Sequence, residues 1–266
     1  MKFIQSRDNP FYKELVKLAG SARQRGKAGQ TLLDGTHLLA ACLDGGRLPR
    51  HLLLNEAALA DAEIGALLER ARSVPVTRLD DRLFAELSEL KTPTGILALI
   101  DLPQPQVDIA QCRFALLLEE IQDPGNLGSM LRSAAAAGCD AVFLSAGCAD
   151  AWSPKVLRAA MGGHFVLDIH ERQDLLRVAQ AFPGALLATS LEAANSLYDC
   201  DLRGNLAFMI GNEGAGLSAA LLQLATQRIT IPMPGRVESL NAAAATAVCL
   251  FEAVRQRRVR EAAARV

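Results

Sequence analysis

The stretch FALLLEEIQDPGNLGSMLRSAAAAG, residues 114–138, joins an apolar run, a polar turn and a helical segment in that order. Residues 114–118 are continuously apolar, which is typical of a strand buried on both faces of a parallel sheet. The tetrapeptide DPGN at 123–126 favours a turn, because each of its residues suits turn geometry. The segment that follows has an alanine-rich face and ends at Gly138, a common helix terminator. This stretch predicts an α/β fold.

The same order of strand, polar loop and helix recurs twice later in the chain. LAFMIGNEGAGLS covers residues 206–218, and ITIPMPGRVESLNAAAATA covers residues 229–247. In an open α/β sheet, ligands bind beyond the carboxyl ends of the strands, where such loops gather. We therefore expect the three loops to form a single site. The glycines of the second loop favour a close approach of backbone to ligand, because glycine has no Cβ.

Each loop also has a simpler interpretation when it is taken alone. Asn126, Ser239 and Asn241 could cap helices, and Glu213 could favour a helix dipole. Arg132, standing alone, is more often a surface residue. The glycine pattern GNEGAG matches neither G-x-G-x-x-G nor G-x-x-x-x-G-K-[ST], so it indicates neither a dinucleotide nor a triphosphate specifically.

Strands and helices alternate along most of the chain, which predicts a mostly parallel sheet. An amphipathic helix is expected within residues 1–20, a basic turn near residues 23–30, a strand at 164–170 and a last helix from about 241 to 260. The polar segment 102–112 contains prolines and lacks periodicity, as linkers do. The predicted divisions are a basic leader (1–22), a small α/β domain (23–101), a linker (102–112) and a larger α/β domain (113–266).

Charge is balanced over the chain but uneven along it. The formal net charge is −1, so no global basic field indicates nucleic acid. The first thirty residues hold seven Lys or Arg against two acids, and residues 255–260 add four arginines: Arg255, Arg257, Arg258 and Arg260. Basic ends can bind a phosphate backbone, although a solvated helix face is the more common explanation.

The six cysteines form no C-x-x-C pair and accompany no histidine cluster, so we expect no zinc site and no metal. Most lie in apolar surroundings, which is typical of reduced thiols in a cytoplasmic protein. The N-terminus lacks the apolar core of a signal peptide, and no run of about 18 apolar residues predicts a membrane span. His164 and His170 are interpreted as structural residues.

The three loops together resemble the signature motifs of the SpoU (TrmH) family of RNA ribose 2'-O-methyltransferases, within the SPOUT superfamily. The matching residues of the first loop are Asp123, Pro124, Asn126, Gly128 and Arg132. Those of the second loop are Ile210, Gly211, Glu213, Gly216 and Leu217. Those of the third loop are Ile231, Pro232, Met233, Gly235, Ser239, Leu240 and Asn241. They occur in the family's order.

This resemblance implies a trefoil-knotted α/β catalytic domain, S-adenosylmethionine as cofactor, and a homodimer whose active site lies near the subunit interface. The cofactor residues that it implies are Thr189, Gly211, Gly216, Ile231, Met233 and Leu240. It also implies that Arg132 activates the ribose hydroxyl. Because arginine keeps its proton in proteins, we expect Arg132 to stabilise the alkoxide or to grip a phosphate.

The remaining polar motif residues are expected to support this chemistry. Asn126 would orient Arg132 or the ribose, and Glu213 would fix the second loop by accepting from backbone N–H groups or from Asn126. Ser239 and Asn241 would act likewise in the third loop. The five expected catalytic residues are therefore Asn126, Arg132, Glu213, Ser239 and Asn241.

The N-terminal residues resemble the ribosomal-protein-like substrate-binding domain that precedes the catalytic domain in many ribosomal-RNA members. Asp34 stands where that subgroup has a glutamate. The resemblance implies methylation of large-subunit ribosomal RNA, with Arg23, Arg25 and Lys27 as candidate RNA contacts. Three alternatives remain: a tRNA 2'-O-methyltransferase, a catalytically silent ribosome-assembly factor that binds RNA, and a small-molecule enzyme that binds a nucleotide phosphate through GNEGAG.

Overall fold

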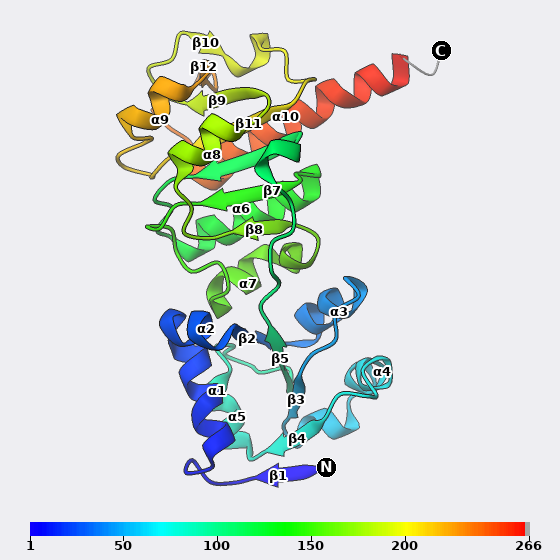
Figure 1. The fold of residues 1–266 in the computed structure, drawn as a ribbon. Coiled ribbons are helices and arrows are strands. Elements are labelled where there is room, and N and C mark those ends of the chain that lie inside the picture. Colours follow the sequence, from blue (N-terminus) through cyan, green and yellow to red (C-terminus); the bar gives the residue numbers. More distant parts are fainter. Residues whose placement is uncertain (264–266) are drawn as a thin grey trace. The chain divides into compact units, whose positions relative to one another are not determined.

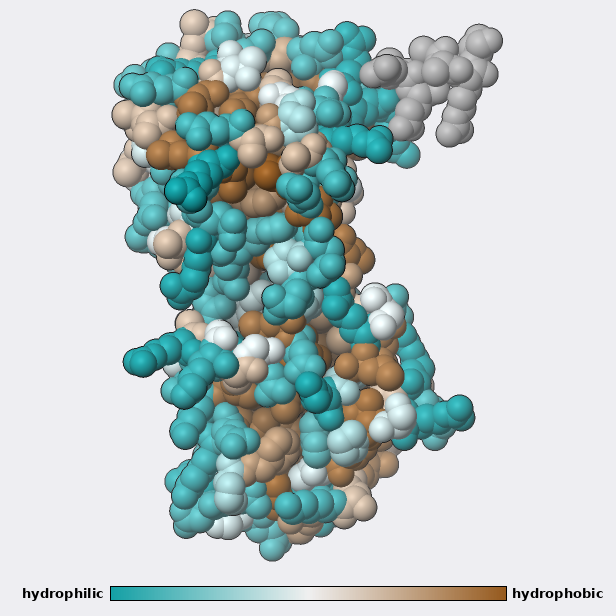
Figure 2. Space-filling model, in the orientation of Figure 1, coloured by the Kyte–Doolittle hydropathy of each residue, from teal (hydrophilic) through white to brown (hydrophobic). Residues whose placement is uncertain are grey.

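The computed structural model describes residues 1–263, with side chains through Arg258, and the chain forms two compact units. The first unit comprises Met1–Gln104 and the later segment Trp152–Phe165. The second comprises Pro105–Ala151 and the chain from Val166 onward. Figure 1 traces both units. Figure 2 shows that hydrophilic side chains cover most of the visible surface of each unit, and that smaller apolar patches lie among these side chains.

The first unit contains a five-stranded mixed sheet in the order β1-β4-β3-β5-β2. Its strands are β1 (Lys2–Ile4), β2 (Gln30–Asp34), β3 (His51–Leu54), β4 (Val76–Leu79) and β5 (Ile96–Asp101). Its helices are α1 (Pro10–Gly20), α2 (Ala22–Ala28), α3 (Thr36–Asp44), α4 (Ala62–Arg70), α5 (Asp81–Leu87) and α7 (Pro154–Ala160). Strand β5 runs antiparallel to both of its neighbours, and the other pairings are parallel.

Helices cover both faces of this sheet. Tyr12, Leu15 and Leu18 of α1 join Leu83 and Phe84 of α5 in one buried cluster. Helices α3 and α4 contact each other, and α3 also contacts β2 and β5. Both faces are therefore closed to water, and binding by this unit must use loops and the outer sides of its helices.

Two sequence predictions fail near the N-terminus. Residues 2–4 form the edge strand β1, whereas only a helix was expected within residues 1–20. The basic segment that was predicted as a turn is helix α2. Ser21 starts this helix by accepting a hydrogen bond from the Gln24 N–H, and Gly29 ends it in the left-handed conformation at φ 63°.

The second unit contains a seven-stranded sheet in the order β10-β12-β9-β11-β6-β7-β8, and every pairing in it is parallel. Its strands are β6 (Phe114–Leu118), β7 (Ala141–Leu144), β8 (Asp168–His170), β9 (Ala185–Thr189), β10 (Asn195–Ser196), β11 (Leu206–Ile210) and β12 (Gln227–Thr230). Its helices are α6 (Pro124–Ala137), α8 (Leu175–Ala181), α9 (Ala219–Leu224) and α10 (Ala242–Ala263). The predicted α/β fold with a parallel sheet is confirmed.

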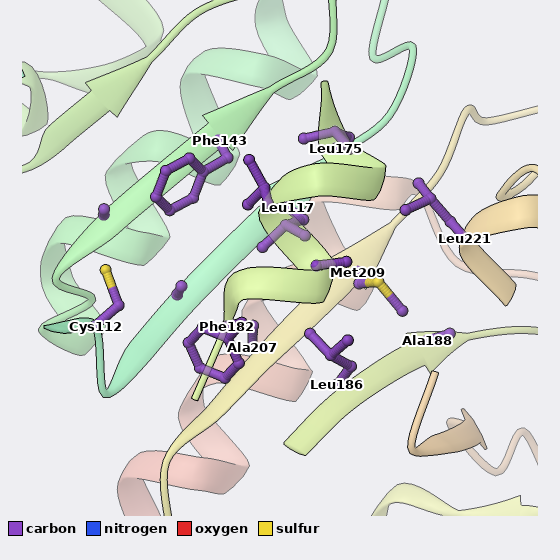
Figure 3. Close-up of a cluster of buried hydrophobic side chains, with 14 of the residues drawn as sticks. Cys112, Leu117, Phe143, Leu175, Phe182, Leu186, Ala188, Ala207, Met209 and Leu221 are labelled. Carbon is purple, nitrogen blue, oxygen red and sulfur yellow. The ribbon is translucent and has the colours of Figure 1, made fainter. Parts of the chain in front are cut away.

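Buried apolar side chains cover both faces of the second sheet. On one face, alternate strand residues such as Leu117, Phe143 and Met209 pack against Leu175 of α8 and Leu221 of α9 (Figure 3). On the other face, α6 and α10 pack together, and α10 contacts β11. This two-sided burial explains why residues 114–118 contain no polar residue.

One C-terminal arginine has a structural role in this packing. The Arg257 guanidinium lies 4.1 Å from the centre of the Phe114 ring. It also donates hydrogen bonds to the carbonyls of Leu202 and Gly204. Burial lowers the pKa of Arg257 from its ordinary value. These contacts occupy the Arg257 guanidinium, which makes it unsuited to a phosphate contact. The side chain of Arg260 lies outside the part of the chain that the structure describes.

Two further strands differ from the predictions. Strand β8 spans only Asp168–His170, because Gly163–Phe165 forms a short 3₁₀ turn instead. The two-residue strand β10 was not predicted, since it is shorter than the periodic patterns that identify elements. The helix expected after the second loop is present as α9 and is only six residues long. No helix among the described residues is both long and apolar enough to cross a membrane.

Candidate functional site

Helix α6 begins three residues earlier than predicted, and this changes the role open to Asn126. Asp123 is the N-cap, and its carboxylate accepts a hydrogen bond of 2.7 Å from the Asn126 N–H. Pro124 occupies the first turn, where it costs no hydrogen bond. The backbone of Asn126 is thus bonded to the N-cap residue, and Asn126 is not itself the N-cap. Its side chain is therefore available for contacts beyond its own helix.

The Asn126 side chain joins the three polar loops. Its Nδ2 donates a 2.8 Å hydrogen bond to Glu213 Oε1 of the second loop. Its Oδ1 accepts a 2.9 Å hydrogen bond from Asn241 Nδ2 of the third loop. We call Asn126, Glu213 and Asn241 the amide hub. Segments 115 residues apart in the chain therefore meet at one point.

Asn241 serves the amide hub and caps α10 at the same time. Its Oδ1 accepts from the backbone N–H groups of Ala243 and Ala244, at 2.9 and 3.2 Å. Its Nδ2 remains free to donate to Asn126. The helix-cap interpretation and the site interpretation of Asn241 therefore both hold.

The second loop is shaped by Asn212, which the sequence interpretation did not single out. Asn212 Oδ1 accepts from the N–H groups of Gly214 and Ala215, and Nδ2 donates to the Glu120 carbonyl. The backbones of Asn212 and Gly216 also exchange two hydrogen bonds. An asparagine that opens a glycine-rich turn is the sequence signal that could have identified this role.

Two acidic residues that follow β6 also hold neighbouring loops. Glu119 accepts a 2.6 Å hydrogen bond from the N–H of Ser218, the N-cap of α9. Glu120 adopts a left-handed backbone with φ 56°, which is rare for a residue other than glycine. In this conformation its carbonyl accepts from Asn212, and its carboxylate accepts from Ser145. Neither residue was predicted.

The glycines of the second loop have different reasons to be glycine. A Cβ on Gly211 would overlap the backbone of Gly216 and Leu217, because the loop folds back upon it. Gly216 has φ 69°, which favours glycine. A Cβ on Gly214 would meet only the Asn212 side chain, at 3.5 Å. At Gly211 the geometry of the loop therefore already requires glycine, before any ligand is considered.

A cavity of about 690 Å³ opens beside the amide hub. Sites for ligands of drug-like size measure roughly 300–1,000 Å³. Three segments line the cavity, together with Leu222: residues 189–192 from the end of β9, residues 210–217 from the end of β11, and parts of the segment from β12 into α10, namely residues 229–231, 233, 239–242 and 245. All six predicted cofactor residues are among the lining residues: Thr189, Gly211, Gly216, Ile231, Met233 and Leu240.

The expected catalytic residues divide into two groups. Glu213, Ser239 and Asn241 line the cavity, and Asn126 adjoins it through the amide hub. Arg132 is exposed and does not line the cavity. Six residues along α6, at 3.6 residues per turn, place it roughly 120° around the helix from Asn126.

Arg132 and Ser239 also lack the side-chain contacts that their expected roles imply, with Asn126 for Arg132 and with the third loop for Ser239. Neither side chain makes a hydrogen bond or ion pair with another described residue. Asn126 uses both ends of its amide on Glu213 and Asn241, so within the chain it does not orient Arg132. Ser239 is exposed at the cavity wall, where a ligand could reach it.

The candidate RNA contacts differ in accessibility. Arg25 is only 5% exposed, and it donates hydrogen bonds to the carbonyls of Leu18 and Ala19 at 2.6 and 3.0 Å. It thereby holds the end of α1, and we withdraw it from the candidate RNA contacts. Arg23 and Lys27 are exposed on α2.

The one thiol close to the first loop is also structural. Cys148 Sγ donates to the Leu118 carbonyl and accepts from the Ile121 N–H. Burial raises the pKa of this thiol, so it stays protonated at neutral pH. Within residues 1–263 we find no group of three or more His, Cys, Asp or Glu side chains that could hold a metal ion.

Comparisons with known proteins match two parts of the chain to two family models. Residues 113–251 match the SpoU rRNA methylase family, and residues 9–98 match the MRM3-like substrate-binding domain. A tRNA/rRNA methyltransferase of Synechocystis, itself uncharacterised, is 36% identical over 95% of this chain and 93% of its own length.

Two further similarities cover nearly the full chain. The Bacillus subtilis protein RlmP, a 23S rRNA guanosine 2'-O-methyltransferase, is 33% identical over 94% of this chain and 98% of its own length. The crystal structure of the SpoU methyltransferase AviRb from Streptomyces viridochromogenes, in complex with S-adenosylmethionine, superposes with a TM-score of 0.81. That match has 29% identity and covers 94% of this chain and 100% of the other.

Proposed function

This chain belongs to the SpoU rRNA methylase family, and from that premise we propose that it transfers a methyl group from S-adenosylmethionine to a ribose 2'-hydroxyl of large-subunit ribosomal RNA. The observation that carries the proposal is the meeting of three motif loops at Asn126, beside a cavity of ligand size. The name of the B. subtilis relative gives the acceptor, a ribose 2'-oxygen of 23S rRNA.

The composition of the cavity fits this cofactor. Its lining is made mainly of small and aliphatic residues and of loop backbone, which suits a flat, uncharged adenosine moiety. No Lys, Arg or His is among its described lining residues. A nucleotide phosphate would need such a cation or a free helix N-terminus. The N-terminus of α10 lines the cavity, but Asn241 Oδ1 already accepts from its Ala243 and Ala244 N–H groups. The cavity therefore disfavours the alternative of an enzyme that binds a nucleotide phosphate.

S-Adenosylmethionine, when bound, supplies a methyl group on a positively charged sulfur. A ribose hydroxyl is a poor nucleophile at neutral pH, so it needs a base or donors that stabilise the alkoxide as its proton leaves. We assign the stabilising role to Arg132, whose planar guanidinium suits an oxyanion or a phosphate. The amide hub fixes the three loops, and Ser239 offers a hydroxyl at the cavity wall.

The position of Arg132 supports a homodimeric enzyme. Arg132 is exposed and does not line the cavity, so a second copy of the chain could place its own Arg132 at the acceptor. Phe251 on α10 is 47% exposed, an apolar side chain that a partner would cover. Mixing the inactive variants Arg132→Ala and Asn126→Ala would restore activity if each copy completes the other's site. The trefoil knot and a cytoplasmic location remain predictions.

The decisive experiment incubates the purified protein with labelled S-adenosylmethionine and with separate preparations of ribosomal RNA and tRNA, then maps the 2'-O-methyl positions. We expect incorporation into the large-subunit RNA at a defined nucleotide. Arg132→Ala should lower the rate by roughly 10²–10³-fold, the usual cost of losing one charge-stabilising donor. Arg177→Ala, at an exposed position on α8, is the matched control.

The possible outcomes separate the alternatives. Methylation of tRNA alone would replace the ribosomal substrate with the tRNA alternative. Cofactor binding without methylation of any RNA would favour the catalytically silent relative. Full activity of Arg132→Ala would remove the role assigned to that guanidinium.

A further inference from the structure

The cavity beside the amide hub has an unusual charge. Two of its lining residues, Glu192 and Glu213, are acidic, and none of the described lining residues is basic. The acids come from two neighbouring loops, because Glu192 follows β9 and Glu213 follows β11, and these strands are adjacent in the sheet. The cavity therefore presents two negative charges to whatever it binds.

Neither negative charge is neutralised within the described chain. Glu213 accepts from Asn126, whose amide carries no net charge. Glu192 has a single hydrogen bond, from its own backbone N–H to Ser190 Oγ at 3.3 Å, and its exposed carboxylate forms no ion pair with a described residue. Both carboxylates thus remain available to a cationic ligand.

The proposed reaction changes the charge of the molecule in this cavity. S-Adenosylmethionine carries a sulfonium, an ammonium and a carboxylate, for a net charge of +1. Its demethylated product, S-adenosylhomocysteine, has a neutral thioether and a net charge of zero. An anionic cavity attracts the first more strongly than the second, whereas uncharged contacts with the shared adenosine part cannot distinguish them.

We infer that Glu192 is a specificity residue that makes the cavity select its ligand by charge, so that the enzyme retains the sulfonium form and releases the thioether product. This inference rests on the proposed function. Glu192 suits the role better than Glu213, because Glu213 is committed to Asn126 of the amide hub. The carboxylate of Glu192 acts through space and needs no fixed hydrogen bond.

The expected size of the effect follows from the exposure of Glu192. In water-like surroundings, one unit charge several ångströms away changes binding by about two- to fivefold, and salt screens that change. Selection by Glu192 should therefore be modest at physiological ionic strength and stronger at low salt.

The test measures dissociation constants by calorimetry for three ligands. These are S-adenosylmethionine, S-adenosylhomocysteine and sinefungin, in which an amine replaces the methylsulfonium and keeps the positive charge. Each is titrated into the wild type, Glu192→Gln and Asp199→Asn, in low-salt and high-salt buffer. Asp199 is an exposed acid in the same unit that does not line the cavity, so its variant controls for the overall change of charge.

We expect Glu192→Gln to weaken the binding of S-adenosylmethionine and sinefungin by about two- to fivefold at low salt, while the affinity for S-adenosylhomocysteine stays unchanged. High salt should remove the difference, and Asp199→Asn should behave as the wild type. Equal weakening of all three ligands, or no weakening of any, would overturn the inference. Failure of all three ligands to bind the wild type would instead overturn the proposed function, so the two failures are distinguishable.

Discussion

The two units of this protein form their candidate binding surfaces in different ways. In the second unit every strand is parallel, so the carboxyl ends of β9, β11 and β12 lie at one edge of the sheet, and their loops line one cavity. In the first unit β5 runs antiparallel to its neighbours, so loops emerge at both edges. Exposed positive charges of the first unit lie instead on its outer surface, including Lys17 of α1 and Arg23 and Lys27 of α2.

This difference shows how topology limits the kind of site that a unit can build. A parallel sheet can bring distant polar residues to one point, and the amide hub is the result. A mixed sheet with covered faces offers an extended surface, which suits a large polyanion better than a small molecule. Single substitutions should accordingly have large effects in the second unit and smaller, cumulative effects in the first.

The sharpest test of the assembled site is Asn126→Ala. The substitution removes both side-chain hydrogen bonds that join the three loops, at 2.8 and 2.9 Å. We expect methyl transfer to fall by roughly 100-fold, because small misplacements of positioned groups cost about that much. A methyl-transfer assay at saturating RNA measures the effect.

Asn195→Ala is the matched control, because Asn195 is an exposed asparagine on the edge strand β10. It should retain wild-type activity. If Asn126→Ala were as active as this control, the meeting of the loops would not depend on the amide hub, and the contrast between the two units would lose its main support.

The first unit is tested by removing three of its exposed charges together. Lys17, Arg23 and Lys27 lie on α1 and α2 and form no ion pair with a described residue. Replacing all three with Ala should weaken RNA binding about tenfold and lower the salt dependence of the affinity, because each lost phosphate contact removes about 0.7–0.9 from the slope. Filter binding across a salt series measures both quantities.

The triple substitution Arg47→Ala, Arg72→Ala and Arg82→Ala removes the same charge from other exposed positions of the first unit. Cofactor binding should be unaffected in either triple variant. An equal loss of RNA affinity in both would mean that only the total charge matters, and that α1 and α2 form no particular RNA surface.

The smallest expected effect concerns Asp34, a buried residue at the end of β2. Its Oδ2 accepts from Ser88 Oγ and from the Glu89 N–H, whereas its Oδ1 has no partner. Burial raises the pKa of this carboxyl, and the Ser88 hydrogen bond only partly opposes the rise. The ionised form is therefore the disfavoured one in the folded unit.

Because the folded-state pKa is raised, Asp34 contributes most to stability below its unfolded pKa, and that contribution is lost as the pH rises through the folded value. Asp34→Asn should stabilise the first unit by up to about 1 kcal/mol at pH 7 and by almost nothing near pH 4. Trp152 is the only tryptophan and belongs to the first unit, so its fluorescence during urea unfolding reports on that unit. A pH-independent difference would contradict this account.

Much of the second unit could be predicted from local pattern. The continuous apolar run at 114–118 identified a doubly covered strand, and the three polar loops after strands indicated one site. Asn126, Glu213 and Asn241 were selected because the motif placed them there, and the structure joins them by hydrogen bonds.

Other features depend on contacts that no local pattern contains. Arg25 lies in a basic segment of the kind that binds RNA, but its side chain is buried, because α2 packs beside the end of α1. Glu119 and Asn212 act on loops far along the chain, at Ser218 and at Glu120, so their partners are visible only in three dimensions. Glu192 follows a strand without any motif, and only the cavity identified it.

The crowded backbone at Gly211 has a consequence for how this sequence can diverge. Any side chain at Gly211 collides with Gly216 and Leu217 of the same loop, and no rotamer can relieve a collision with backbone. Gly214, three residues away, leaves room for a methyl group. In a saturation-mutagenesis library, only glycine should be tolerated at position 211, whereas position 214 should tolerate other residues. Invariance at position 211 across descendants would then record the geometry of the loop, whatever ligand those descendants come to bind.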